Sequence, residues 1–308
     1  MLTEPMDVLK QFPIRKTGKQ KKAFRDAVQS YAEALNYPVK IEKGSLGSRN
    51  IVIGDPDNAK YLITAHYDTP ASIGLPNIIT PKNLLFYIFW QFLLVGVFFV
   101  FAFAVGIPVA FLTHDSSAGF VAGYVAYFGL LILMMGGPAN RHNANDNTSG
   151  VVAVLETAKS MPENLRGKVC FVLFDLEEAG LVGSASYRKT HKNASENQIV
   201  LNLDCVGDGN EIVLFPTKKV KKQDNLMSAL DKISGSFGIK SIALHKKGFS
   251  VYPSDQKNFP LGVGIAAFRR HKLLGLYCSR IHTWRDTILE QTNINVLRAA
   301  LITLITND

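Results

Sequence analysis

The sequence has 308 residues and a hydrophobic fraction of 47%, enough for one large α/β domain or two small ones. Its net charge of +9 comes without a recognisable nucleic-acid-binding motif, so we expect no nucleic-acid partner. Cys170, Cys205 and Cys278 are odd in number and far apart, which argues against a disulfide framework and is typical of a reducing compartment. Seven basic residues and no apolar core in the first 25 positions argue against a secretory signal.

The first elements in chain order are a helix and two strands. Residues 17–36 have apolar side chains spaced for one face of a helix. Residues 50–54 and 60–65 are short and apolar, and an Asp-Pro-Asp-Asn sequence separates them, which predicts two strands joined by a turn.

Two long apolar runs follow. No Asp, Glu, Lys or Arg occurs from Asn83 to Thr113 or from Ser116 to Asn140, and only His114 and Asp115 lie between the runs. Each run reaches the ~20 apolar residues that cross a bilayer. We therefore predict a transmembrane helical hairpin at residues 83–137, inserted into a catalytic domain formed by residues 1–82 and 138–308. The alternative is a buried core hairpin or an oligomerisation arm of a soluble protein.

The residues around the hairpin predict its orientation and packing. Lys82 and Arg141 flank it and Asp115 lies at its tip, so the positive-inside rule places the globular domain in the cytoplasm. The chain would then be an integral membrane protein with two spans. The second run has a face of small residues that could pack against the first helix or against another copy, giving a homo-oligomer: Ala118, Gly119, Ala122, Gly123 and Ala126.

Strand and helix patterns alternate after the hairpin. Helices are predicted at residues 148–159, 224–235 and 293–305, and strands at residues 168–174, 198–204, 211–215, 240–245 and 263–268. This alternation predicts a single α/β domain whose central sheet is mostly parallel or mixed and is flanked by helices.

Side chains that can bind metal ions stand at the ends of these predicted elements. Ligands of α/β proteins gather outside the carboxyl ends of the strands, so these side chains should meet. Two histidines and at least four carboxylates are what a pair of divalent cations requires. They are His66 and Asp68 after one strand, Asp146 before a helix, Glu177 and Glu178 after a second strand, Asp204 at the end of a third, and His282 near the C-terminus.

The order of these residues resembles the co-catalytic zinc exopeptidases of the aminopeptidase S and aminopeptidase Y type, in clan MH. That pattern is His-x-Asp, an Asp before a helix of small residues, Glu-Glu, a strand-terminal Asp and a late His. Residues 254–259 and 262–265 also resemble the stretch ahead of the last histidine. Apart from the hairpin, the resemblance runs from about residue 15 to the C-terminus.

The resemblance implies two zinc ions and a role for each side chain. Asp146 would bridge the ions, with His66 and Asp204 on one and Glu178 and His282 on the other. Asp68 would accept a hydrogen bond from the second ring nitrogen of His66. Glu177 would be left free as the general base that takes a proton from water and passes it to the leaving amine.

The resulting prediction is a membrane-anchored zinc aminopeptidase that acts on short peptides. The hairpin leaves the catalytic domain between two of the implied metal ligands, His66 and Asp146. The metal site should therefore lie within roughly 30 Å of the bilayer. Two departures from the family's pattern bear on specificity: 77 residues separate Asp68 from Asp146, and no residue is identified that would bind a substrate amine. The alternatives are a glutaminyl-cyclase-type enzyme with a single zinc and a non-catalytic membrane receptor or scaffold on the same fold.

Overall fold

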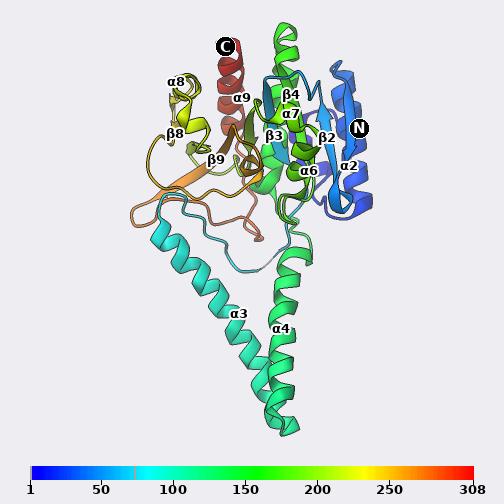
Figure 1. The fold of residues 1–308 in the computed structure, drawn as a ribbon, viewed down its shortest axis with the longest axis vertical. Coiled ribbons are helices and arrows are strands. Elements are labelled where there is room, and N and C mark those ends of the chain that lie inside the picture. Colours follow the sequence, from blue (N-terminus) through cyan, green and yellow to red (C-terminus); the bar gives the residue numbers. More distant parts are fainter. Residues whose placement is uncertain (1, 73) are drawn as a thin grey trace.

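The computed structural model describes residues 2–72 and 74–308 and has one mixed sheet at its centre (Figure 1). The strand order is β1-β2-β4-β3-β5-β9-β6-β8-β7, with β10 paired to β9. This arrangement confirms the predicted α/β domain with a mixed sheet. The strands are β1 (Val39–Lys43), β2 (Arg49–Ile53), β3 (Tyr61–His66), β4 (Val169–Phe174), β5 (Ile199–Leu203), β6 (Glu211–Pro216), β7 (Gly235–Phe237), β8 (Lys240–Leu244), β9 (Gly262–His271) and β10 (Gly275–Tyr277).

The centre of the sheet is parallel. β3 pairs in parallel with both β4 and β5, and β5 pairs in parallel with β9. Every residue of β3, β4 and β5 is buried. Strands covered on both faces are mostly apolar along their whole length, which is why these three were recognisable without an alternating pattern.

Helices cover both faces of the sheet. On one face α2, α5, α8 and α9 pack on a core that includes Phe171 and Leu173 of β4. On the other face Tyr187 of α6 packs with Val172 and Phe174 of the same strand. The helices of the globular part are α1 (Val8–Gln11), α2 (Gly18–Ala34), α5 (Gly150–Ser160), α6 (Val182–Thr190), α7 (Lys192–Ser195), α8 (Asp224–Lys232) and α9 (Gln291–Thr306).

Some short elements go beyond the sequence prediction, among them β1, β7, β10 and α6. β1 has the sequence Val-Lys-Ile-Glu-Lys and lies at the sheet edge, and the three residues of β7 are exposed at the other edge. Edge strands are half-solvated and commonly charged, so their sequences carry a weak strand signal. α6 has nine residues, most of them small or polar, so few large apolar side chains mark it as a helix in the sequence.

The two apolar runs form α3 (Leu84–Thr113) and α4 (Ser116–Gly136), which project from the globular part and converge toward their shared tip (Figure 1). Both are long and apolar enough to cross a membrane. Large apolar side chains along them face outward, for example Phe92, Phe111 and Phe120, each more than 70% exposed. This exposure does not fit a core hairpin buried within a single chain.

Glycines bring the two helices into close contact near the tip. A Cβ atom on Gly119 would lie 2.4 Å from the Cβ of Ala110, and one on Gly106 would lie 2.7 Å from the carbonyl oxygen of Gly119. On Gly123 it would lie 3.0 Å from the carbonyl oxygen of Ala102. The small-residue face of α4 is therefore occupied by α3 of the same chain.

Replacing Gly119 with alanine is expected to destabilise the hairpin by about 1–3 kcal/mol, because the added methyl group overlaps α3. The measurement is the loss of helicity by circular dichroism during transfer from a mild detergent into dodecyl sulfate. Gly129→Ala is the matched control, since nothing lies within 4 Å of a Cβ at Gly129. Equal transition midpoints for the two variants would show that the close contact is absent.

Candidate active site

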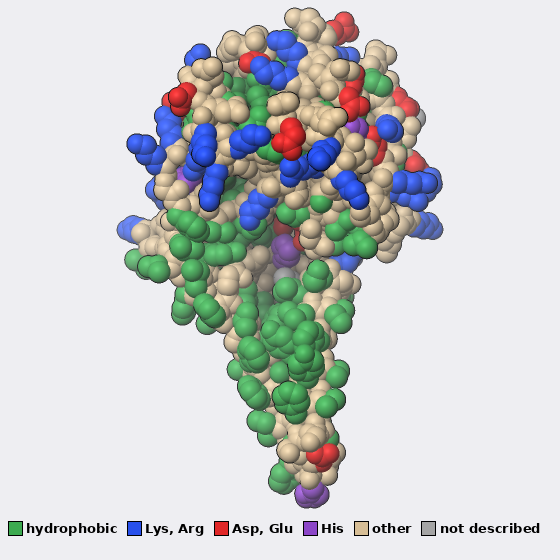
Figure 2. Space-filling view, in the orientation of Figure 1, with side chains coloured by type: hydrophobic (Ala, Val, Ile, Leu, Met, Phe, Trp, Pro, Cys, Tyr) green, Lys and Arg blue, Asp and Glu red, His purple; other side chains and the backbone are tan. Residues whose placement is uncertain are grey.

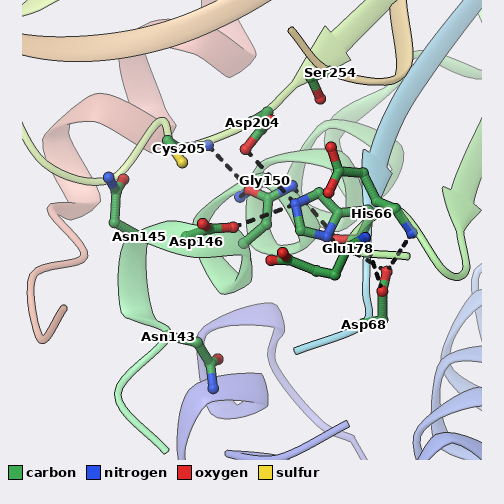
Figure 3. A network of polar contacts seen from close by, with 12 residues as sticks. His66, Asp68, Asn143, Asn145, Asp146, Gly150, Glu178, Asp204, Cys205 and Ser254 are labelled. Atoms are coloured by element: carbon green, nitrogen blue, oxygen red, sulfur yellow. Dashed lines mark hydrogen bonds and ion pairs between the residues drawn. The ribbon is translucent and has the colours of Figure 1, made fainter. Parts of the chain in front are cut away.

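Three neighbouring parallel strands bring four of the predicted residues to one edge of the sheet. His66 is the last residue of β3, Asp204 directly follows β5, and Glu177 and Glu178 lie in the turn after β4. Because the three strands run in the same direction, their carboxyl ends are adjacent. Figure 3 shows the side chains of His66, Glu178 and Asp204 close together around Asp146.

Asp146 and His282 come from loops. Asp146 lies in the buried segment Ala144–Ser149 that precedes α5, and His282 lies between β10 and α9 with φ of 59°. One carboxylate oxygen of Asp146 is 3.3 Å from Nε2 of His66, and the other is 3.1 Å from Nε2 of His282. Asp146 thus stands between the two histidines, as a bridging carboxylate would.

Two groups of possible ligands share Asp146. In one, His66, Asp146 and Asp204 have ligand atoms within 4.8 Å of one another, and in the other Asp146, Glu178 and His282 do. Asp204 is 3.7 Å from His66, and Glu178 is 3.6 Å from His282. Ligands of a tetrahedral zinc ion bound at about 2.1 Å are about 3.4 Å apart, so both groups fit zinc.

Asp68 lies beside His66 but is hydrogen-bonded elsewhere. Its Oδ1 is 3.6 Å from Nδ1 of His66, longer than a hydrogen bond. The two oxygens of Asp68 instead accept the backbone N–H groups of Glu177, at 3.0 Å, and Glu178, at 3.2 Å. Asp68 therefore holds the turn that carries both glutamates, a role that the sequence pattern did not indicate.

Asp286 holds the Asp146 segment in a similar way. Its carboxylate accepts the backbone N–H groups of Asn145, at 2.7 Å, and Asp146, at 2.9 Å. The side chain of Asn147 donates to the carbonyl of Leu203, tying the same segment to β5. No role was predicted for Asp286; the available signal was its position four residues after His282.

Two buried cations compensate part of the negative charge. Arg15 is fully buried and donates to the carbonyl of Tyr67 at 2.5 Å and to the hydroxyl of Thr148 at 3.1 Å. Burial lowers the pKa of Arg15 to about 10, although Asp68 and Asp146 oppose the shift. Lys21 forms a 2.5 Å ion pair with Asp175. Arg15 precedes the predicted helix and Lys21 lies within it, and nothing in the sequence assigned either residue to the site.

The remaining negative charge shifts the protonation of the site. Burial raises the pKa of Glu177 well above its usual range, with Glu178 adding to the shift, and burial raises the pKa of Glu178 to about 8. Burial alone would lower the pKa of His282, but Glu178 and Asp146 outweigh it and raise this pKa to about 9. Without a metal ion the site therefore holds protons that free side chains would release, as expected of a cation site.

These shifts predict how the metal-free protein responds to pH. Glu178 and His282 bind more protons in the folded than in the unfolded chain, so folding stability falls as pH rises from about 5 to about 9. We expect the melting temperature, measured in detergent with a chelator, to fall by about 5 °C or more over this range. Zinc should raise it more at pH 8 than at pH 6, since zinc competes with these protons. A melting temperature that rises with pH would contradict the assignment.

The converging side chains open into a cavity of about 190 Å³. Figure 2 shows a hollow at the junction of the globular part and the hairpin, with histidine and acidic side chains at its base. The cavity is lined by His66, Asn77, Ile79, Tyr87, Gln91, Asp146, Glu177, Glu178, Asp204, Cys205, Tyr252, Pro253, Ile281 and His282.

Comparison with known proteins places the chain in a family. The comparison with curated proteins returned no match. Glutaminyl cyclase from Porphyromonas gingivalis is 16% identical, with a TM-score of 0.61 over 99% of this chain and 96% of its own. A Zn-dependent exopeptidase from Parabacteroides distasonis is also 16% identical, with a TM-score of 0.60 over 99% and 96%. The LapA aminopeptidase of Legionella pneumophila is 15% identical, with a TM-score of 0.58 over 98% and 70%.

At these identities the solved structures establish a shared fold. The sequence model of peptidase family M28 matches residues 128–304, which is more than half of the chain. The matched range contains Asp146, both glutamates, Asp204 and His282. The chain belongs to peptidase family M28, and its fold is the one found in zinc exopeptidases and glutaminyl cyclases.

Proposed function

We propose that the chain is a membrane-anchored zinc aminopeptidase that removes N-terminal residues from short peptides. The observation that carries this proposal is the position of Asp146, with one oxygen toward His66 and the other toward His282. Two ligand groups that share a carboxylate are what a pair of zinc ions needs. Asp146 would bridge the ions, His66 and Asp204 would hold one, and Glu178 and His282 would hold the other.

Glu177 is the proposed general base. It lines the cavity beside Glu178, and Asp68 accepts its backbone N–H, which holds the turn that carries its side chain. Zinc, when bound, supplies Lewis-acid chemistry that acidifies water and polarises a carbonyl group. Glu177 takes a proton from the attacking water and delivers it to the leaving amine.

The size of the cavity supports an exopeptidase. Its volume of about 190 Å³ is below the ~300–1,000 Å³ typical of sites for drug-sized ligands. Such a cavity suits the end of a peptide better than a chain that passes through.

A second candidate function is glutaminyl cyclase chemistry with a single zinc ion. Its support is the likeness of the fold to glutaminyl cyclases of Porphyromonas gingivalis and Tannerella forsythia, with TM-scores of 0.61 and 0.58. The presence of both ligand groups favours two ions and hence the aminopeptidase. It also disfavours a non-catalytic receptor or scaffold, which would have no use for the free base Glu177.

The full-length protein in mild detergent tests these candidates. Its zinc content is measured together with hydrolysis of a panel of aminoacyl p-nitroanilides and cyclisation of a peptide with N-terminal glutamine. Two zinc ions with chelator-sensitive hydrolysis is the expected result. One zinc ion with cyclisation would favour the second candidate, and a folded protein without either reaction would reject both.

The proposed anchor is the α3–α4 hairpin, with the globular domain on the cytoplasmic side. Lys82 precedes α3 and Arg141 follows α4, and Nζ of Lys16 reaches the carbonyl of Met135 near the end of α4. These cations gather where the hairpin meets the globular part, as the positive-inside rule requires. A homo-oligomer, if formed, would use the outer faces of the hairpin, because its glycines contact each other within one chain.

A further inference from the structure

One wall of the active-site cavity is formed by helix α3 of the hairpin and by the connection that leads from β3 into it. Asn77 and Ile79 from the strand-to-hairpin connection and Tyr87 and Gln91 from α3 line the same cavity as the proposed zinc ligands. This wall is fixed in place. Ile79 exchanges two backbone hydrogen bonds with Cys278, and the indole of Trp90 donates to the carbonyl of Pro76 at 3.2 Å.

Tyr87 and Gln91 are polar residues on an apolar helix, and both face the cavity. They are four residues apart, so they lie on the same side of α3. Their neighbours Leu85 and Phe92 are 82% and 72% exposed on the outer side. Gln91 is the one amide side chain in α3. A glutamine in a membrane helix is costly unless it is paired, so its position toward the cavity calls for a polar partner there.

None of the residues that the structure describes supplies that partner. Within residues 2–72 and 74–308, no side-chain hydrogen bond is formed by Asn77, Tyr87 or Gln91. By contrast, the hydroxyl of Tyr252 on the globular side of the cavity already donates to the carbonyl of Asp204 at 2.8 Å. Asn77, Tyr87 and Gln91 therefore add unpaired polar groups to the cavity, beside those of the proposed zinc ligands such as Nδ1 of His66 and Oε1 of Glu178.

We propose that Tyr87 and Gln91 bind the backbone of the substrate, and that the substrate is a peptide held at the membrane surface while its N-terminal residue occupies the zinc site. This inference rests on the proposed aminopeptidase function. Gln91 lies seven residues into α3, about 10 Å along the helix, so the cavity reaches the level where α3 would enter the bilayer. A peptide with an apolar segment in the bilayer would present its free N-terminus at this depth.

The test uses the full chain in phosphatidylcholine vesicles and the variants Gln91→Leu and Tyr87→Phe. Phe92→Leu is the control, because Phe92 is adjacent in sequence but faces outward. The substrates are a peptide with N-terminal leucine and a C-terminal palmitoyl chain, and the same peptide without the chain. We expect the wild-type kcat/KM to be higher for the palmitoylated peptide.

In the two variants, KM for the palmitoylated peptide should rise about 3- to 10-fold, the effect of one lost hydrogen bond, with kcat and zinc content unchanged. Binding of the palmitoylated peptide to zinc-free protein, measured by fluorescence anisotropy, should weaken by the same factor. Unchanged KM in both variants, or an equal rise in Phe92→Leu, would overturn the role of these residues. Equal wild-type kcat/KM for both peptides would overturn the membrane-held substrate. A wild type inactive on both would reject the proposed function itself, and this inference with it.

Discussion

Replacing Glu177 with glutamine is expected to lower kcat by about 10²- to 10⁴-fold while zinc content stays unchanged. Glutamine has nearly the same shape but cannot accept a proton from water. The backbone N–H of Glu177 remains bonded to Asp68, so the turn should keep its conformation. The measurement is kcat on an aminoacyl p-nitroanilide, with zinc per chain determined on the same sample.

The adjacent glutamate provides the matched control. Glu178→Gln removes a proposed ligand that lies 3.6 Å from His282, so it should lower zinc content as well as activity. If the two variants lost zinc equally, Glu177 would be a ligand rather than the base. If Glu177→Gln kept full activity with both ions bound, the proposed mechanism would be wrong.

Replacing Asp146 with asparagine should have the largest effect on metal content, because Asp146 contacts both histidines. An asparagine offers one oxygen and no charge, so each ion would lose a ligand or its counter-charge. Loss of a residue that only supports a ligand typically weakens metal binding by about 10- to 100-fold, and we expect at least this much for both ions. Activity should become undetectable.

The variant Asp204→Asn tests whether Asp146 is a bridging ligand, because Asp204 is proposed to bind only one ion. Asp204 belongs only to the group with His66 and Asp146, so this variant should lose one zinc ion and keep the other. Zinc per chain by mass spectrometry, after dialysis against a weak chelator, distinguishes the two results. Equal zinc content in Asp146→Asn and Asp204→Asn would argue against a bridge.

The sequence was informative where a metal-binding side chain follows a buried strand. β3, β4 and β5 are mostly apolar and fully buried, and His66, Glu177 and Asp204 stand at or just after their ends. Parallel pairing then brings these positions together without further information. The meeting of the site residues could therefore be predicted, whereas their individual roles remain predictions that the variants above address.

The roles of residues that act through long-range contacts could not be predicted from the sequence. Arg15 reaches the site only because the N-terminal segment packs against the loop after β3, where its backbone N–H bonds to Thr69. Asp286 and Asp68 accept backbone N–H groups, a role that the sequence did not show for either residue, although the His-x-Asp pattern had pointed to Asp68. Such contacts depend on the folded geometry.

The hairpin, too, could be predicted only in part from the sequence. Its length and composition indicated two helices, and its glycines indicated close packing. The sequence did not show that Tyr87 and Gln91 of α3 line the active-site cavity, because this depends on how α3 is oriented relative to the globular part. We propose that α3 shapes the substrate pocket of this chain without contributing a metal ligand.

The most direct measurement is the anomalous scattering of crystals of the full-length protein grown with zinc. We predict two peaks about 3.5–4 Å apart on either side of Asp146, one bounded by His66 and Asp204 and the other by Glu178 and His282. A single peak would support the one-zinc alternative. Zinc-replete crystals without a peak between these side chains would contradict the proposed metal centre and the enzymatic activity built on it.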